Sequence, residues 1–315
     1  MAEKKLRLKW TTVAEIVLLA GCVVLEFGKF AFTGDSVHDL ILNTGLTRLL
    51  AGVFFLLLIK ESGLRVFSWT PAGEFATSVL LTLPALLVAV NNLPAISLAT
   101  GDCGITDTPL WVAIFFVQCM CVGFFEELAF RGLLFPYFLK KCKTRLHVFL
   151  CIAGTSCLFG LYHLLNLLEG AGIGPVLRQV GYSALVGAMC AACMLLTGNV
   201  VVPVILHGVY NFCGLVVPTL GDGTWWDVPT IVITVVLAVA ATAYFAVVFV
   251  RKKSFRLLDA LGIRLENGER RQDGSIPENG NGENDSDNNK SENDSGAVRK
   301  MPGNNINVAE EEKKE

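Results

Sequence analysis

Residues 110–135 have the sequence LWVAIFFVQCMCVGFFEELAFRGLLF. The segment is long enough to cross a bilayer, which requires about 20 predominantly apolar residues. Because a chain in lipid must satisfy its own backbone hydrogen bonds, the segment is predicted to be a transmembrane helix. It also carries two carboxylates and a guanidinium, Glu126, Glu127 and Arg131. Charged side chains in a membrane span are costly, so they mark a candidate functional site.

Seven further segments have the same apolar character. The fold class predicted from them is all-α: a polytopic membrane helical bundle with about eight transmembrane helices. The predicted spans are 11–28, 40–60, 75–98, 110–135, 146–166, 178–197, 199–218 and 229–250.

The composition agrees with a membrane protein followed by a polar tail. Of the 315 residues, 53% are hydrophobic and 17% are charged, whereas about a quarter of a soluble domain is charged. This excludes an ordinary soluble enzyme, a fibrous protein and a nucleic-acid-binding protein, which would present a basic face. Residues 1–265 form the predicted transmembrane domain. Residues 266–315 hold 7 basic and 13 acidic side chains and ten asparagines, which predicts a disordered cytosolic tail.

Basic residues predict the orientation in the membrane. They gather at the N-terminus and in alternate connections, whereas the other connections carry aspartates and few basic residues. By the positive-inside rule, both termini are predicted to be cytosolic, in the plasma membrane if the cell is prokaryotic. The basic residues are Lys4, Lys5, Arg7, Lys9, Lys60, Arg65, Lys140, Lys141, Lys143, Arg145, Arg251, Lys252, Lys253 and Arg256.

The ten cysteines do not form an evident disulfide framework, because most lie in apolar runs, where cysteine acts as a small hydrophobe. Cys190 and Cys193 have C-x-x-C spacing, but on a predicted membrane helix, which disfavours redox or metal chemistry. Cys22 ends a lipoprotein-like box, Leu19-Ala20-Gly21-Cys22. Glu15 inside the preceding apolar stretch favours a transmembrane helix over a cleaved signal peptide; whether Cys22 is lipidated stays open.

The charged cluster of the fourth span suggests a division of roles. Glu127 and Arg131 are four residues apart and share a helix face, so they are predicted to form an ion pair. Glu126 lies about 100° round the helix, which leaves it unpaired by local geometry. An unpaired carboxyl group away from water is a candidate general base. The alternative is a purely structural charge cluster that locks helices together.

Two of the four histidines also lie well inside predicted spans. His163 ends the stretch Phe159–His163 in the fifth span, and His207 lies four residues before Asn211 in the seventh. A carboxylate and imidazoles can activate water, and an amide with an imidazole can stabilise the oxyanion that forms when water attacks a carbonyl. The adjacent Gly160 and Gly208 are expected to leave room for a substrate backbone.

Depth along the helices argues against a simple meeting of these residues. At 1.5 Å per residue, Glu126 lies roughly 21 Å from Lys140 and His163 roughly 25 Å from the start of its span. His207 lies only about 12 Å from the start of its span. Pro136 and Pro203 are expected to break helices and shift these positions.

The three motifs together resemble those of the CAAX protease and bacteriocin-processing family, the membrane proteases related to the Ras-converting enzyme. That family's signature is E-E-x-x-x-R, then F-x-x-x-H, then H-x-x-x-N or D, on successive helices. Here these are Glu126-Glu127 with Arg131, Phe159 with His163, and His207 with Asn211. The resemblance covers about residues 110–215.

The resemblance implies an intramembrane endopeptidase and a role for each residue. Glu126 would activate the attacking water with assistance from His163, and His207 with Asn211 would form the oxyanion hole. Glu127, Arg131 and Phe159 would support the site. The implied mechanism uses no metal; zinc is possible in principle, because two histidines and a carboxylate can bind it, but no H-E-x-x-H motif is present.

The implied partners are membrane lipids and a peptide substrate, either a prenylated C-terminal segment or a leader peptide, and no nucleic acid. Two other functions stay open: a non-catalytic immunity or scaffold protein with the same fold, and a proton-coupled transporter, because buried Glu and His also build proton relays. Four further polar residues of the predicted spans either line the cavity or lie near its mouth: Glu15, Glu26, Asn91 and Asn92.

Overall fold

The computed structural model describes residues 2–69, 72–224 and 228–266. The predicted tail lies, apart from residue 266, outside the described residues, so its disorder stays a prediction. Among the described residues the chain is almost wholly helical, and the only strands are β1 and β2, of three residues each, which pair antiparallel. The predicted all-α class is confirmed.

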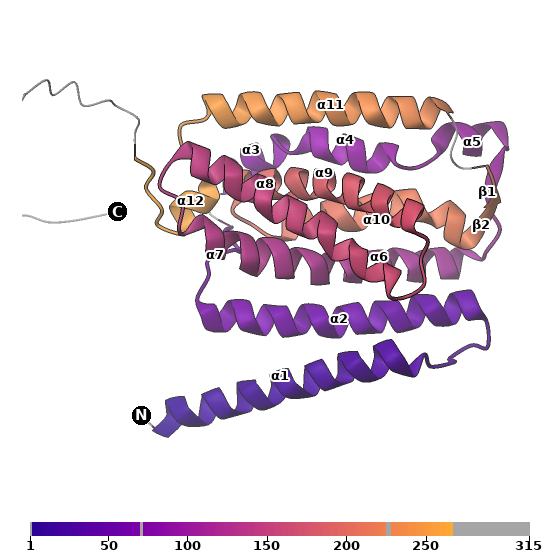
Figure 1. The fold of residues 1–315 in the computed structure, drawn as a ribbon, viewed down its shortest axis with the longest axis horizontal. Helices are drawn as coiled ribbons and strands as arrows, with labels where there is room; N and C mark the ends of the chain where they lie inside the picture. Colours follow the sequence, from indigo (N-terminus) through magenta and orange to yellow (C-terminus); the bar gives the residue numbers. More distant parts are fainter. Residues whose placement is uncertain (1, 70–71, 225–227, 267–315) are drawn as a thin grey trace, which may run out of the picture. The chain divides into compact units, whose positions relative to one another are not determined.

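The elements follow one another in a simple order along the chain (Figure 1). The first half consists of α1 (Ala2–Gly28), α2 (Ser36–Ser62), α3 (Ala72–Leu80), α4 (Leu83–Asn91), α5 (Ala95–Thr100), β1 (Cys103–Ile105), α6 (Pro109–Glu127), the π-helix η1 (Leu128–Leu134) and α7 (Phe135–Leu139). The second half consists of α8 (Arg145–Tyr162), the 3₁₀-helix η2 (His163–Leu167), α9 (Ile173–Thr197), α10 (Val201–Leu220), β2 (Gly221–Gly223), α11 (Val228–Arg251) and α12 (Arg256–Ala260).

The helices are numerous and long enough to confirm the predicted spans. Within the described residues, seven helical stretches are long and apolar enough to cross a membrane, and α3 and α4 form an eighth if this bent pair is one span. The bend measures 43° and lies just before Pro84. Proline lacks a backbone N–H and favours the first turn of a helix, so it ends α3 and begins α4. The span predicted at 75–98 is therefore broken, and it ends at Asn91.

The bundle has inner and outer helices (Figure 1). In the most apolar window of α9, 61% of the residues are buried, compared with none in α1. α6 packs between α2 and α10, α8 packs on α9, α11 packs on α4, and α1 packs mainly on α2. The inner helices α6, α8, α9 and α10 hold one another in place, so they can fix the geometry that a site needs.

The basic connections meet at one end of the bundle. The guanidinium group of Arg145 donates hydrogen bonds to the backbone carbonyl groups of Val250 and Lys252, and Arg65 and Lys140 line a common pocket. Figure 1 shows α7 and α12 at this end and β1 and β2 at the opposite end. This grouping is what the charge pattern predicts. That the basic end faces the cytosol stays a prediction.

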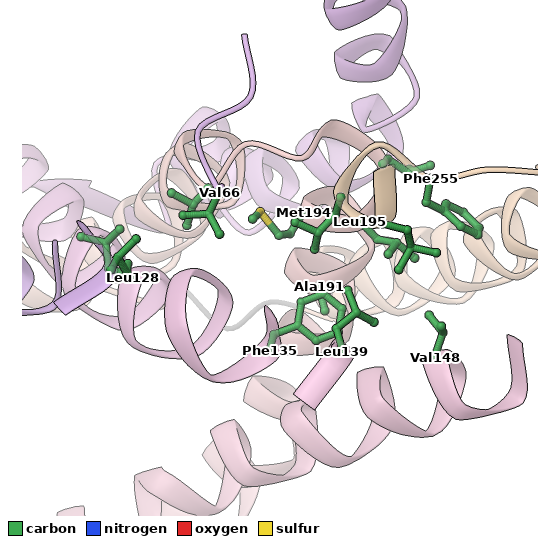
Figure 2. Packing of buried hydrophobic residues seen from close by; sticks show 14 of the residues in the cluster. Val66, Leu128, Phe135, Leu139, Val148, Ala191, Met194, Leu195 and Phe255 are labelled. Carbon is green, nitrogen blue, oxygen red and sulfur yellow. The ribbon is translucent and has the colours of Figure 1, made fainter. Parts of the chain in front are cut away.

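A cluster of buried apolar side chains closes the basic end (Figure 2). Val66, Phe135, Leu139, Met194 and Phe255 belong to it, and each is at most 2% exposed. Their packing joins η1 and α7 to α9, α12 and the segment before α3. Because close-packed interiors resist displacement, the cluster fixes the end of the helix that carries Glu126 and Glu127.

At the opposite end of the bundle, a polar contact joins α2 to Asp107, which lies just before α6. The Nε2 atom of His38 lies 2.6 Å from Oδ2 of Asp107, and the His38 ring stacks on Trp111 at 3.7 Å. The hydrogen bond with His38 holds the pKa of Asp107 below its usual value. A carboxyl group whose pKa is lower in the folded protein than in the unfolded chain stabilises the fold. This stabilisation is complete above the pKa of the unfolded chain, about 3.9, and is lost as the pH falls through the pKa of the folded protein.

Replacement of Asp107 by asparagine is therefore expected to lower the melting temperature of the purified protein at pH 6. The difference from wild type should shrink as the pH falls below about 4, where the wild-type carboxyl group also becomes neutral. Thermal unfolding of both proteins across this pH range measures the effect. The exposed Asp222 provides the control: its replacement by asparagine should leave the melting temperature unchanged. A difference that is constant from pH 3 to pH 7 would contradict the assignment.

Candidate functional site

The site begins at the last turn of α6, where Glu126 and Glu127 are both buried. One turn earlier, a Cβ atom on Gly123 would lie 2.8 Å from the carbonyl oxygen of Val204 and 3.0 Å from the amide nitrogen of Gly208. No side chain fits there, so glycine allows the backbones of α6 and α10 to touch. This contact brings the two glutamates to the level of His207, which α10 carries.

The helix changes its hydrogen-bonding pattern directly after the glutamates. η1 is a π-helix, and its end is marked by the N–H of Phe135, which donates to the carbonyl oxygen of Phe130 five residues earlier. Pro136 follows and has no N–H to continue an α-helical ladder. The expected break at Pro136 is therefore a wider turn in a continuous helix. Such π segments occur frequently at functional sites, and this one carries Arg131.

Glu127 is the centre of a buried charge cluster. Its Oε1 atom accepts a hydrogen bond from Nη1 of Arg131 at 2.8 Å and lies 2.8 Å from Nδ1 of His207. The predicted ion pair between Glu127 and Arg131 is confirmed. The guanidinium carbon of Arg131 also lies 4.4 Å from the centre of the Phe159 ring, a cation–π contact. Glu127 thus joins α6 to α10, and Arg131 joins η1 to α8.

The second ring nitrogen of His207 faces the other glutamate. Nε2 lies 3.6 Å from Oε2 of Glu126. That oxygen is buried and has no hydrogen-bond partner among the described residues. An unsatisfied buried carboxyl oxygen is costly, about 1–3 kcal/mol or more if it is charged. The Glu126 oxygen therefore marks a place where a small polar ligand such as water would be stabilised.

His163 approaches the same region from α8. It begins η2, one turn after Phe159, and its ring centre lies 5.3 Å from that of Phe159. The Phe159 ring also lies 5.7 Å from His207, edge to face. The two imidazoles therefore flank one buried phenyl ring, which holds them apart. Among the described residues, no hydrogen bond to the His163 side chain is found, so its ring nitrogens are available to a ligand.

Asn211 lies one turn after His207 on α10 and is partly exposed. The structure describes no hydrogen bond between its side chain and another described residue. The distances above thus join six of the predicted site residues into one cluster: Glu126, Glu127, Arg131, Phe159, His163 and His207. Asn211 lies beside this cluster because it is one helical turn after His207.

The depth mismatch expected for His207 has a structural explanation. Asn199 and Val200, in the turn before α10, are fully buried. The N–H of Val200 donates to the carbonyl oxygen of Val66, and the Asn199 side chain donates to that of Ser68. Because a chain segment covers this turn, α10 starts inside the protein, and His207 lies deeper than counting from residue 199 indicates.

The expectation that Gly160 and Gly208 leave room for a substrate backbone is wrong. The space beside Gly160 is occupied by Val180 and Ala184 of α9, and the space beside Gly208 by Met120 of α6. These glycines allow close helix packing and leave no room for a substrate. Gly187, which the sequence did not single out, touches the site instead: a Cβ atom there would lie 2.7 Å from Nη2 of Arg131 and 3.1 Å from Cδ1 of Phe159.

Replacement of Gly187 by alanine should therefore displace the Arg131 guanidinium group and weaken its hydrogen bond to Glu127. A drop of about 1–3 kcal/mol in stability is expected, as for other overpacked interiors. Thermal unfolding of the variant measures it. Gly181→Ala on the same helix is the matched control, because nothing lies within 4 Å of a Cβ atom there. Equal stability of the two variants would contradict the assigned role of Gly187.

Asn91 and Asn92, which were expected to line the cavity or lie near its mouth, form hydrogen bonds between helices. The side chain of Asn91 donates to Oγ1 of Thr234 on α11, and that of Asn92 donates to the backbone carbonyl of Tyr210 on α10. Glu15 on α1 has one buried carboxyl oxygen without a hydrogen-bond partner among the described residues, whereas Glu26 faces α2 and forms a pair with Arg48 at 3.6 Å. Sequence inspection missed Arg48, although a cation inside a span is a signal in itself.

The described residues contain no group of three His, Cys, Asp or Glu side chains arranged to hold a metal ion. Cys190 and Cys193 are buried and free. The use of a metal is therefore not decided by geometry, and metal-free hydrolysis stays a prediction.

Comparison with known families identifies the domain that contains this site. Residues 108–213 match the family described as Rce1-like, type II CAAX prenyl endopeptidase. This segment is therefore similar to an Rce1-like domain, and it makes up 106 of the 315 residues of the chain. It covers Glu126, Glu127, Arg131, Phe159, His163, His207 and Asn211, and its bounds agree with the resemblance expected for residues 110–215. No curated protein and no solved structure matches the chain. The matched segment lies in a chain whose described residues include seven or eight helices able to span a membrane, so the chain is an integral membrane protein.

Proposed function

We propose that this protein is an intramembrane endopeptidase that hydrolyses a peptide bond with a water molecule activated by Glu126. One observation carries the proposal: a buried, unpartnered oxygen of Glu126 faces His207 at 3.6 Å inside an Rce1-like domain. A carboxylate that is shielded from bulk water and has an open acceptor oxygen is suited to hold and deprotonate a nucleophilic water.

The charges of the cluster suggest the protonation state of His207. Two carboxylates, Glu126 and Glu127, are accompanied by one permanent cation, Arg131. A second positive charge on His207 would balance the cluster, since a buried net charge is strongly disfavoured. Both ring nitrogens then carry protons. Nδ1–H donates to Glu127, and Nε2–H points to the Glu126 side of the site.

The reaction then follows from these positions. Glu126 takes a proton from the water, and the water oxygen bonds to the carbonyl carbon of the peptide. The carbonyl oxygen becomes an oxyanion, which Nε2–H of His207 and the side-chain amide of Asn211 stabilise. The C–N bond breaks when Glu126 passes its proton to the leaving nitrogen. The products are one carboxylic acid and one amine, and Glu126 returns to its starting charge.

The other residues of the cluster have supporting roles in this proposal. Glu127 and Arg131 orient His207, as a hydrogen-bonded carboxylate orients histidine in other hydrolytic sites. Phe159 separates the two imidazoles, and His163 assists in holding the water. The mechanism proposed here involves no metal.

The proposed substrate is a membrane-associated peptide: a prenylated C-terminal segment or a leader peptide. The surrounding partners are membrane lipids. With the basic end in the cytosol, both termini are cytosolic, and in a prokaryotic cell the protein resides in the plasma membrane.

Peptide termini in the cell provide the test. Cells that lack this protein are complemented with the wild-type chain or with Glu126→Gln, and the N- and C-termini of their membrane proteins are compared by mass spectrometry. The expected result is a set of new termini that depends on the wild-type chain. Identical termini in both cells, with a phenotype that survives Glu126→Gln, would point to an immunity or scaffold role. Proton-driven flux in proteoliposomes that requires Glu126, without new termini, would point to transport.

A further inference from the structure

Two adjoining cavities lie at the basic end of the bundle, where Figure 1 shows α7 and α12. The first, called here the polar cavity, has a volume of about 260 Å³, and its lining includes Arg65, Lys140 and Asp259. The second, called here the apolar cavity, has a volume of about 400 Å³, and its lining includes Leu133 and Leu134 of η1. Lys140 lines both, so the two cavities meet at this residue.

The two cavities lie at different levels along the helices that cross the membrane. One apolar stretch long enough to cross ends at Ser62 and another ends at Leu139. Arg65 and Lys140 of the polar cavity follow shortly after these two ends. Leu133 of the apolar cavity lies inside the second stretch, more than one turn before its end. The polar cavity is therefore at the level of the lipid head groups, and the apolar cavity is at the level where the acyl chains begin.

The cations of the polar cavity are not neutralised by the protein. Among the described residues, neither Arg65 nor Lys140 forms an ion pair or a side-chain hydrogen bond. Asp259 is the one carboxylate in the lining of this cavity, and it pairs with neither cation. Two cations therefore face one carboxylate across a hollow. A phosphate group is suited to this place, because it accepts the planar fork of an arginine and the point charge of a lysine together.

The apolar cavity has the surroundings of a lipid contact. Its lining includes the side chains of Leu64, Leu133 and Leu134, together with Tyr137, which is 54% exposed. Tyrosine is typical of the boundary between hydrocarbon and head groups. Nζ of Lys141 lies 4.3 Å from the centre of the Tyr137 ring and donates to its hydroxyl group at 3.2 Å. A further cation thus lies beside an apolar hollow at the membrane boundary.

We propose that the two cavities together bind one anionic phospholipid, with its phosphate between Arg65 and Lys140 and the start of an acyl chain along Leu133 and Leu134. Basic pockets between transmembrane helices recognise anionic head groups in this way. The site is separate from the proposed active site, because Lys140 lies roughly 21 Å along the helix from Glu126. The proposal therefore does not depend on the peptidase function. The bound lipid joins the end of α2 to the end of α7.

Competition between two lipids tests the proposal. The purified full chain in detergent is mixed with equal amounts of dioleoyl phosphatidylglycerol and dioleoyl phosphatidylcholine, and the bound lipid is identified by native mass spectrometry. The two lipids have the same acyl chains and differ in net charge. The chain should bind phosphatidylglycerol with a preference of at least about tenfold, the effect expected of two cations at a lipid head group. Equal binding of the two lipids would overturn the proposal.

The double variant Arg65→Gln with Lys140→Gln should reduce this preference to less than about threefold. The matched control is Arg251→Gln with Lys253→Gln, which also removes one arginine and one lysine from exposed positions at the basic end. These two residues line neither cavity, so the control should keep the wild-type preference. A preference that survives in the first variant, or that falls equally in both, would show that the cavities do not select the lipid and would overturn the proposal.

Leu134→Trp provides an independent readout if the double variant does not fold. The larger ring fills the apolar cavity and should weaken binding of phosphatidylglycerol at least about threefold, since the burial of a single methylene group changes affinity by about this factor. Leu110→Trp is the control: Leu110 is 66% exposed at the other end of the same apolar stretch, and binding should be unchanged. Unaltered binding in Leu134→Trp would overturn the proposal.

A soluble head group separates a lipid site from a site for free phosphate compounds. Glycerol 3-phosphate, added at the same concentration as phosphatidylglycerol, should leave the lipid bound, because it lacks the acyl chains that the apolar cavity accommodates. Displacement of the lipid by glycerol 3-phosphate at this concentration would assign the cavity to a soluble anion and would overturn the proposal.

Discussion

Replacement of Glu126 by glutamine is expected to abolish peptide cleavage and to leave the protein folded. The amide keeps the size of the side chain but cannot take a proton from water, and loss of a general base lowers rates by about 10²–10⁴. The buried Oε2 of Glu126 has no hydrogen-bond partner among the described residues, so glutamine breaks no existing hydrogen bond of that oxygen. Cleavage of an internally quenched, farnesylated peptide by the purified protein measures the rate.

Glu266→Gln is the matched control for this experiment. It makes the same chemical change at an exposed position at the end of the described chain, and it should cleave at the wild-type rate. The melting temperatures of all three proteins should agree within a few degrees. A Glu126→Gln protein that cleaves at more than a tenth of the wild-type rate would show that another group activates the water.

Replacement of Arg131 by methionine should have the largest effect on stability. Arg131 is 2% exposed and donates to Glu127 at 2.8 Å. Removal of one partner of a buried pair leaves the other charge uncompensated, which costs about 3–5 kcal/mol. In a domain of this size the melting temperature should fall by on the order of 10 °C. Thermal unfolding in detergent, followed by tryptophan fluorescence, measures the change.

The double variant Arg131→Met with Glu127→Gln separates charge from packing. It removes both charges of the pair, so part of the lost stability should return relative to Arg131→Met alone. Its activity should stay low, because His207 then lacks the carboxylate that orients it. If the stability lost in the double variant equals the sum of the losses in the two single variants, the pair is not coupled and the cluster does not act as one unit.

The sequence was sufficient to predict the spans and the order of the motifs. Apolar length decides a membrane helix almost alone, because lipid leaves the backbone no other partner. The pair of Glu127 and Arg131 followed from the helical repeat. The family motifs indicated the segment that carries the candidate site, and the match over residues 108–213 agrees with it.

Other features depend on tertiary structure and could not be predicted in this way. The burial of Asn199, which sets the depth of His207, results from a covering segment more than 130 residues earlier in the chain. The spaces beside Gly160 and Gly208 are filled by neighbouring helices that no local pattern reveals. Arg48 was visible as a charge within a span, but only the packing of α1, α2 and α6 places it beside Phe125.

The central claim is that Glu126 and His207, from two different helices, act on the same hydrolytic event. A double-mutant cycle on the cleavage rate tests it most directly, with Glu126→Gln, His207→Ala and both substitutions together in the purified protein. Residues that act as one unit are strongly non-additive. We expect the double variant to be no slower than the slower single variant, within about threefold. Rate losses that multiply, or full activity in either single variant, would contradict the claim.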